Sequence, residues 1–263
     1  MSNNETITDI FIKTYHKDFI WLEYCLKSIK LFAKGFRNVV VVTDNDSNTL
    51  PQKYIDILPI KLFYVDLPKI KPTFVEHGLG YLWQQYIKLS WYKYSDADEV
   101  LVLDSDEMLT TITYPDNFKI NGKYNWFYKN WDEMGDAKCW KPSTDKILKT
   151  DTKNSGMCLT GFILQKEASL QLKNHLCNMH DTTDIFDIFI KYDMPTCSEY
   201  NIFGAFIELY NIQSYNIIMR DDTQKYFNHT IKKYWSWGGL NETIIKENND
   251  ILKNGILENG ILG

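Results

Sequence analysis

Several features of secreted and membrane proteins are missing from the sequence. The five cysteines are an odd number without a C-x-x-C pair, which indicates reduced thiols and neither a disulfide framework nor a zinc site. The first residues are polar and then strand-like, unlike a signal peptide, and no apolar run approaches the roughly 20 residues of a spanning helix. We therefore expect a cytoplasmic protein with no membrane span.

An excess of positive charge is missing too. The 34 aspartates and glutamates outnumber the 29 lysines and arginines, so the net charge is −5 and we expect no nucleic-acid partner. Aromatic side chains are abundant, with 8 Trp, 17 Tyr and 14 Phe. Most must lie in a core, and some can stack on the faces of sugars or bases. At 263 residues the chain suffices for one large domain or two small ones.

The N-terminal part alternates between apolar, strand-like runs and helical patterns. The predicted strands lie at 8–15, 38–46, 60–68 and 99–109, and the predicted helices at 19–35 and 80–94. Asp18 is the expected N-cap of the first helix and Gly35 its C-terminal stop. Continuous apolar strands joined by helices predict an α/β fold with a Rossmann-like, mainly parallel central sheet flanked by helices.

Beyond Tyr114 the pattern is looser. The elements expected there are a strand within 154–167 and helices at 167–180 and 198–211. The last segment, 247–263, repeats a short G-I-L unit. We expect it to be a loosely packed end that takes no part in the fold.

Polar side chains follow three of the predicted strands. Thr14 and Tyr15 end the first, Asp44 ends the second, and Asp104 and Asp106 end the fourth. Because ligands of open α/β sheets bind at the carboxyl ends of the strands, we expect these residues to share one edge.

The pair in "VLVLDSDEML", Asp104 and Asp106, places two carboxylates one residue apart. Like charges this close repel unless a cation lies between them. Mg²⁺ or Mn²⁺ prefers oxygen ligands and often takes one or two protein carboxylates, with substrate phosphates completing its shell. The pattern therefore predicts a metal–diphosphate site. The alternative is a pair of solvated turn residues.

This motif, with "TDIFIKTY" and "VVVVTDND" before it, resembles the GT-A class of nucleotide-sugar-dependent glycosyltransferases. Over residues 8–208 the likeness is greatest to small bacterial and large-DNA-virus members. The resemblance implies a hexosyltransferase-type enzyme that uses Mn²⁺ or Mg²⁺. It would move a sugar from a nucleoside diphosphate sugar, most often a UDP-sugar, to a hydroxyl of a glycan acceptor.

The resemblance also implies one catalytic domain over 1–263. A nucleotide-binding half would occupy about 8–110, an acceptor and catalytic half about 111–240, and a tail 241–263.

The resemblance also implies which residues bind the metal and the donor. Asp104 would lie near the donor ribose and the metal, Ser105 would share the donor site, and Asp106 would coordinate the metal. His229 would be a third metal ligand, with water as the alternative.

For the nucleotide, the resemblance implies that Thr14 and Tyr15 flank it, that Asp44 reads the base and that Lys88 faces the phosphates or ribose. The alternatives are a simple turn at Asp44 and a solvated helix face at Lys88.

An inverting transferase needs a carboxylate that takes the proton of the acceptor hydroxyl. In inverting members of the class it lies at the start of a helix, where this chain has Glu199. The alternative is a capping role. Rival carboxylates are Asp132, Glu133 and Asp136, and a retaining mechanism would need no such base.

The aromatic segment at 123–140 would then be the acceptor wall, with Trp126, Trp131 or Trp140 stacking on a sugar; packed core aromatics are the alternative. The small residues of "TGF", 160–162, would let the donor sugar approach the backbone.

Two other functions remain open. "LDSDEML" also resembles the motif of haloacid-dehalogenase-like phosphotransferases, with Asp104 as nucleophile, Asp106 as general acid and Asp221-Asp222 as the metal loop. In that family, however, the motif opens the domain and a threonine stands where this chain has Met108. A non-catalytic carbohydrate-binding module is the other alternative, although it would not need a pair of carboxylates at a strand end.

Overall fold

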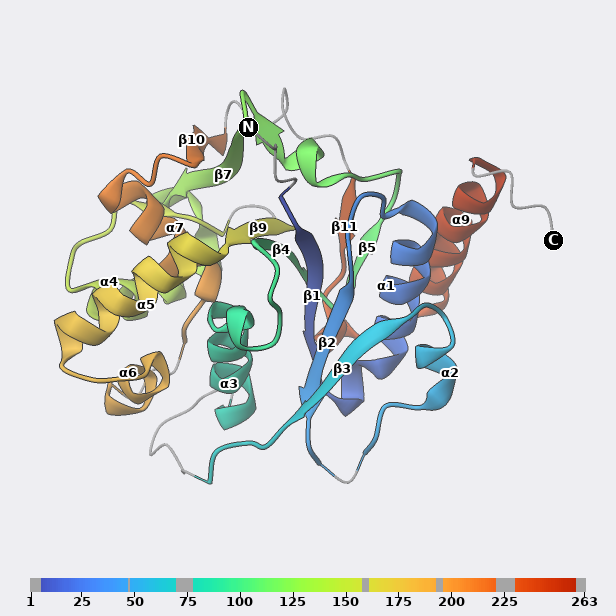
Figure 1. Cartoon of the computed structure of the whole chain (residues 1–263), viewed down its shortest axis with the longest axis horizontal. Coiled ribbons are helices and arrows are strands. Elements are labelled where there is room, and N and C mark those ends of the chain that lie inside the picture. Colours follow the sequence, from blue (N-terminus) through green and yellow to red (C-terminus); the bar gives the residue numbers. More distant parts are fainter. Residues whose placement is uncertain are drawn as a thin grey trace.

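The central element is a five-stranded, mainly parallel sheet in the order β3-β2-β1-β4-β9 (Figure 1). The computed structural model describes residues 6–46, 48–69, 78–157, 161–192, 196–220 and 230–258. The strands of this sheet are β1 (Thr8–Thr14), β2 (Val39–Asp44), β3 (Ile60–Val65), β4 (Glu99–Asp104) and β9 (Phe162–Gln165). Only β9 runs antiparallel to its neighbour, so the predicted α/β sheet is confirmed.

Burial on both faces explains why the inner strands are continuously apolar. Every residue of β1 and β2 is buried, as expected for a parallel sheet covered on both sides. The chain passes from β1 out to β3 and then returns to place β4 beside β1. The carboxyl ends of β1 and β4 thus meet where the strand order reverses, which is where open α/β sheets bind ligands.

Helices cover both faces of this sheet. In Figure 1, α1, α2 and α9 lie on one side, and α3 lies with α5, α6 and α7 on the other. The helices are α1 (Phe19–Phe32), α2 (Gln52–Ile55), α3 (Gly78–Leu89), α4 (Lys141–Leu148), α5 (Lys166–His180), α6 (Ile185–Lys191), α7 (Glu199–Tyr210) and α9 (Glu242–Glu258). The helices predicted near 19–35, 80–94, 167–180 and 198–211 are confirmed, although α1 ends three residues early and α3 both begins and ends before its predicted bounds.

Short 3₁₀ turns join these elements. They are η1 (His16–Asp18), η2 (Trp91–Lys93), η3 (Pro115–Phe118), η4 (Trp131–Glu133), η5 (Gly135–Trp140) and η7 (Ser236–Gly238).

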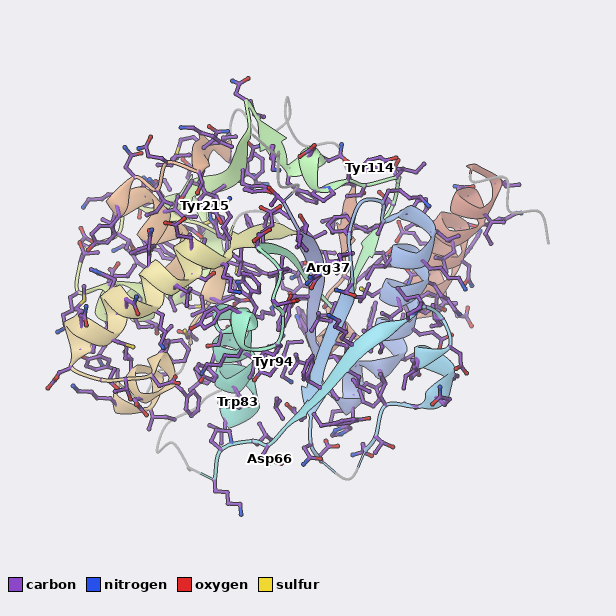
Figure 2. The ribbon with its side chains drawn as sticks, viewed as in Figure 1. Arg37, Asp66, Trp83, Tyr94, Tyr114 and Tyr215 are labelled. Atoms are coloured by element: carbon purple, nitrogen blue, oxygen red, sulfur yellow. The ribbon has the colours of Figure 1, made fainter. Side chains whose placement is uncertain are left out.

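A second sheet forms from the part whose pattern was loose. It contains β6 (Lys119–Ile120), β7 (Lys123–Asn130), β8 (Asn154–Ser155) and β10 (Tyr215–Met219). The middle of β7 is buried on both faces, so its sequence shows no alternation. Tyr215, labelled in Figure 2, ties the two sheets together: its hydroxyl donates to the Ile163 carbonyl and accepts from the Gln165 amide.

The C-terminal segment returns to the N-terminal half, and the expectation of a loosely packed end was wrong. Strand β11 (Ile231–Lys233) pairs antiparallel with β5 (Glu107–Leu109), and α9 packs on α1. Gly255 allows this contact, because a Cβ atom there would overlap the Phe32 ring. Residues 259–263 lie outside the described residues.

None of the described helices is long and apolar enough to cross a membrane.

Cys25, Cys177 and Cys197 are free, buried thiols.

The contact between α9 and α1 can be tested with two glycine substitutions. Gly255→Ala should lower the free energy of unfolding by about 1–3 kcal/mol, because the methyl group overlaps the buried Phe32 ring. In α3, a Cβ atom at Gly80 would meet no atom within 4 Å. Gly80→Ala should therefore raise the free energy of unfolding by up to about 1 kcal/mol, because alanine has the higher helix propensity. Urea unfolding measures both. Equal stabilisation by the two substitutions would contradict the packing of α9.

Candidate active site

The two aspartates of the motif lie at the carboxyl edge of the parallel sheet. Strand β4 ends at Asp104, the chain turns through Ser105 and Asp106, and β5 begins at Glu107. The Glu107 carboxylate closes this turn by accepting a hydrogen bond from the Asp104 amide at 2.9 Å. In the sheet register Asp104 is opposite Lys13, next to Thr14 at the end of β1. The predicted grouping of strand ends is confirmed for β1 and β4.

Asp104 is held between two lysines. Lys88 Nζ of α3 donates to Asp104 Oδ1, and Lys233 Nζ of β11 donates to Oδ2 at 2.8 Å. Burial alone would raise the pKa of Asp104, but Lys233 and Lys88 together lower it well below its ordinary value. The Asp104 carboxyl group is therefore ionised, and each of its two oxygens accepts a hydrogen bond from a lysine.

Lys88 also joins the motif to Glu199 at the start of α7. The second ion pair, from Lys88 Nζ to Glu199 Oε1, is 2.7 Å long. Lys88 is only 2% exposed, so the alternative of a solvated helix face is wrong. Burial raises the pKa of Glu199 above its ordinary value, and Lys88 offsets this only in part.

Asp106 differs from Asp104 because only one of its two carboxylate oxygens accepts a hydrogen bond from the described residues. The Ser236 amide donates to its Oδ2 at 2.8 Å, and the Tyr234 amide donates to its carbonyl. No described residue donates to Oδ1. Burial and the neighbouring Asp104 charge raise the pKa of Asp106. This is the like-charge penalty that the sequence predicted.

Three further charged residues lie at the site although the sequence did not predict them: Lys233, Glu107 and Asp18. Glu107 is fully buried against Lys233, and burial raises its pKa to about 7. Burial and the Asp106 charge raise the pKa of Asp18 to about 6. The one available signal for Asp18 was its place shortly after a strand end. It was expected to be the N-cap of α1, but its side chain makes no capping bond.

The charge balance of this cluster favours a cation. Five carboxylates face two ammonium groups, which leaves three negative charges when all are ionised. The five carboxylates belong to Asp18, Asp104, Asp106, Glu107 and Glu199. Asp106 Oδ1 fits a hard divalent ion that takes few protein ligands. Across the described ranges no group of three His, Cys, Asp or Glu side chains is placed to hold a metal, so phosphate or water would complete the shell.

The residues predicted to bind the nucleotide lie around this cluster. Asp44 Oδ1 accepts from Lys13 Nζ at 2.7 Å, and the same ammonium donates to the Thr14 carbonyl. Tyr15 is 36% exposed and so is open to a ligand, whereas Ser105 is buried.

Other predicted residues lie elsewhere. Trp126 and Trp131 are buried, at 0% and 2% exposed, so their assignment to an acceptor wall was wrong; Trp140 is half-buried. At Gly161 a Cβ atom would overlap the Ile231 side chain, so this backbone faces β11 and offers no space for a sugar.

The rival carboxylates lie on the surface. Asp132, Glu133 and Asp136 are exposed, and Asp132 pairs with Lys138. Thr160, His229 and Asp221-Asp222 lie outside the described residues.

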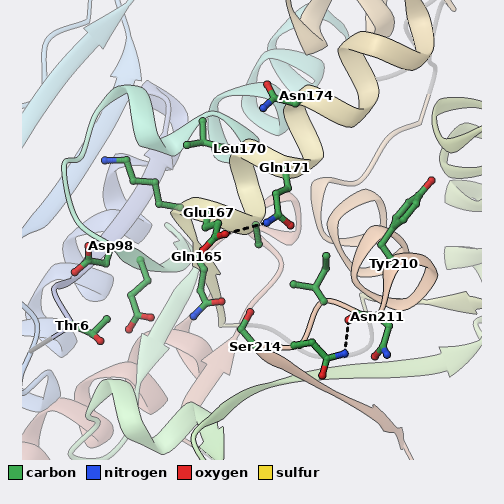
Figure 3. Close-up of a pocket in the computed structure, with 15 residues that line it drawn as sticks. Thr6, Asp98, Gln165, Glu167, Leu170, Gln171, Asn174, Tyr210, Asn211 and Ser214 are labelled. Atoms are coloured by element: carbon green, nitrogen blue, oxygen red, sulfur yellow. Dashed lines mark hydrogen bonds between the residues drawn. The ribbon is translucent and has the colours of Figure 1, made fainter. Parts of the chain in front are cut away.

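A cavity of about 920 Å³ opens at the other end of the sheet (Figure 3). It lies where β4 and α5 begin and where α7 leads into β10. Residues such as Asp98, Gln165 and Tyr210 line it. No residue predicted for the site is among those that line it.

Several solved structures are similar to this chain. Galactosyltransferase LgtC, crystallised in complex with donor and acceptor sugar analogs, matches with a TM-score of 0.53 at 10% identity, over 94% of this chain and 95% of that one. An active-site mutant of LgtC matches with a TM-score of 0.53 at 11% identity and the same coverage. The glycosyltransferase GlyE of Streptococcus pneumoniae TIGR4 matches with a TM-score of 0.48 at 13% identity, over 97% of this chain and 64% of that one.

The LgtC likeness shows that the chain has a GT-A-type α/β fold, as the sequence predicted. No curated protein matches the chain in sequence. Residues 7–246 match a family described as a family of unknown function, DUF6492. The chain therefore belongs to the DUF6492 family.

Proposed function

We propose that the chain is a metal-dependent glycosyltransferase that moves a sugar from a nucleoside diphosphate sugar to a hydroxyl of a glycan acceptor. The observation that carries the proposal is the half-buried Asp106 carboxylate. One of its oxygens accepts no hydrogen bond from the described residues, and it lies at the strand-order reversal of a mainly parallel sheet, beside the ionised Asp104. The fold shared with LgtC, whose structure holds donor and acceptor sugar analogs, supports the assignment.

Asp106 would hold Mn²⁺ or Mg²⁺, with Asp104 beside it and His229 as a third ligand. When bound, the ion offsets the charge of the leaving nucleoside diphosphate. Lys233 contributes positive charge at the same place, since its ammonium group lies between Asp104 and Glu107. Both lysines also keep Asp104 ionised, so that a ligand meets a carboxylate and not a carboxylic acid.

The nucleoside would lie along the ends of β1 and β2. Tyr15 is exposed there, whereas the side chains of Thr14 and Ser105 are buried. Lys13 occupies one oxygen of Asp44, so the other is the one we expect to accept a hydrogen bond from a base N–H. A uracil offers such an N–H group, which is compatible with a UDP-sugar donor.

Glu199 would act as the base of an inverting transfer. Lys88 holds Oε1 in place, so Oε2 would take the proton as the acceptor hydroxyl attacks the anomeric carbon. Burial raises the pKa of Glu199, which brings a carboxylate nearer to the basicity that such a step needs at neutral pH.

Metal-dependent nucleotide binding can be read from thermal unfolding. With Mn²⁺, one nucleoside diphosphate at about 100 times its dissociation constant should stabilise the protein by roughly 2.7 kcal/mol, or about 5–10 °C. Asp106→Asn should abolish the shift. Without ligand this variant should be as stable as the wild type or more so, because it removes a half-buried charge beside Asp104.

Asp136→Asn is the matched control, since Asp136 is exposed and should leave the shift unchanged. A folded wild-type protein that responds to no nucleoside diphosphate, with or without metal, would refute the proposed function. Phosphatase assays would then test the phosphotransferase alternative.

The role of Glu199 can be separated from its ion pair with Lys88 by kinetics. Glu199→Gln should lower kcat by about 10²–10⁴-fold while leaving the dissociation constant of the nucleoside diphosphate unchanged. Because the base must be ionised, wild-type kcat should fall as the pH drops through a pKa above the ordinary glutamate value. In the variant, the residual kcat should lose this acidic limb.

Glu208→Gln, at the other end of α7, is the control; that side chain accepts a hydrogen bond from Asn154. If Glu199→Gln lowers only the melting temperature and kcat keeps its pH profile, Glu199 is a structural partner of Lys88. NMR of the product anomer then reports whether the configuration is inverted or retained.

A further inference from the structure

Two tryptophans beside the site are unusually exposed. Trp237 exposes 84% of its surface and Trp235 exposes 54%, although large aromatic side chains are mostly buried in folded proteins. Their ring centroids are 6.3 Å apart, with an angle of 46° between the planes. Lys233 Nζ, which pairs with Asp104, lies 5.5 Å from the Trp235 ring centroid.

The residue between them anchors the segment to the acidic cluster. The Ser236 amide donates to Asp106 Oδ2 at 2.8 Å. The side chain of Ser236 lies beside the Asp18 carboxyl group. On either side, the Tyr234 amide donates to the Asp106 carbonyl, and the Gly238 and Gly239 amides close the turn η7. The backbone that carries the two indole rings is therefore fixed next to Asp106.

Their place in the fold is on the nucleotide side of the motif. Asp18 belongs to η1, which directly follows β1 and Tyr15. Burial and then the charges of Asp18, Asp106 and Asp44 raise the pKa of Tyr15, so these three carboxylates lie near its hydroxyl group. Glu199 instead reaches Asp104 through Lys88. Ser236 thus connects the motif to the end of β1, where the base is expected, and not to the side where Glu199 would meet the acceptor.

We infer that Trp235 and Trp237 form a stacking surface for the nucleobase of the donor. The inference rests on the proposed function and adds to it the surface on which the ring of the base would stack. Flat, neutral indole rings attract a base through stacking that tolerates any base identity. Specificity would then come from hydrogen bonds such as that expected at Asp44.

The experiment compares a ligand that has a base with one that lacks it. Isothermal titration with Mn²⁺ present measures binding of UDP, GDP, CDP and ADP, and of inorganic pyrophosphate, to the whole protein. Trp237→Ala should weaken the best nucleoside diphosphate by about 5- to 150-fold and leave pyrophosphate unchanged. Trp237→Phe keeps a ring and should recover most of the affinity. Trp235→Ala should behave like Trp237→Ala.

The exposure of Trp237 makes these variants safe for folding, which circular dichroism checks. If the wild type binds a nucleoside diphosphate and both alanine variants bind it equally well, the stacking surface is refuted while the proposed function stands. A loss confined to kcat/KM for the acceptor would assign the rings to the acceptor sugar and also refute the inference. If the wild type binds neither nucleotide nor pyrophosphate, the proposed function fails and the inference with it.

Discussion

The site depends on the two ion pairs that hold Asp104 between Lys88 and Lys233. These three side chains come from β4, α3 and β11, and Lys88 extends the contact to Glu199 on α7. Removing charges from water is costly, and a single missing partner would leave an uncompensated buried charge worth about 3–5 kcal/mol. The four elements are therefore coupled, and the strand end cannot shift without breaking an ion pair.

This coupling makes the two aspartates of one motif chemically different. Each oxygen of Asp104 accepts a hydrogen bond from an ammonium group, whereas the Asp106 side chain accepts, from the described residues, a single hydrogen bond from a backbone amide. Asp104 is thus ionised and held in place at the carboxyl edge of the sheet, whereas Asp106 is the residue to which we assign the cation in the proposed function. The two carboxylates of one motif therefore differ in charge environment, because Lys88 and Lys233 both pair with Asp104.

The C-terminal segment completes this arrangement. Strand β11 brings Lys233 to the motif through its pairing with β5, and α9 fixes the segment by packing on α1. Gly255 permits that packing because it has no side chain to collide with Phe32. The segment adds the amide that holds Asp106 and the exposed indole rings beside it, so a portion of the chain that looked dispensable closes the site.

The sequence by itself determined the parallel sheet, its helices and the carboxylate pair, because these follow from local apolar runs and from where they stop. It also singled out Lys88 and Glu199, but not that they would form an ion pair, since 111 residues separate them. Only the tertiary structure brought Lys233 and Asp18 to the motif, buried Trp126 and Trp131 and exposed Trp237. Those outcomes depend on which distant segments meet, and composition and periodicity carry no record of such contacts.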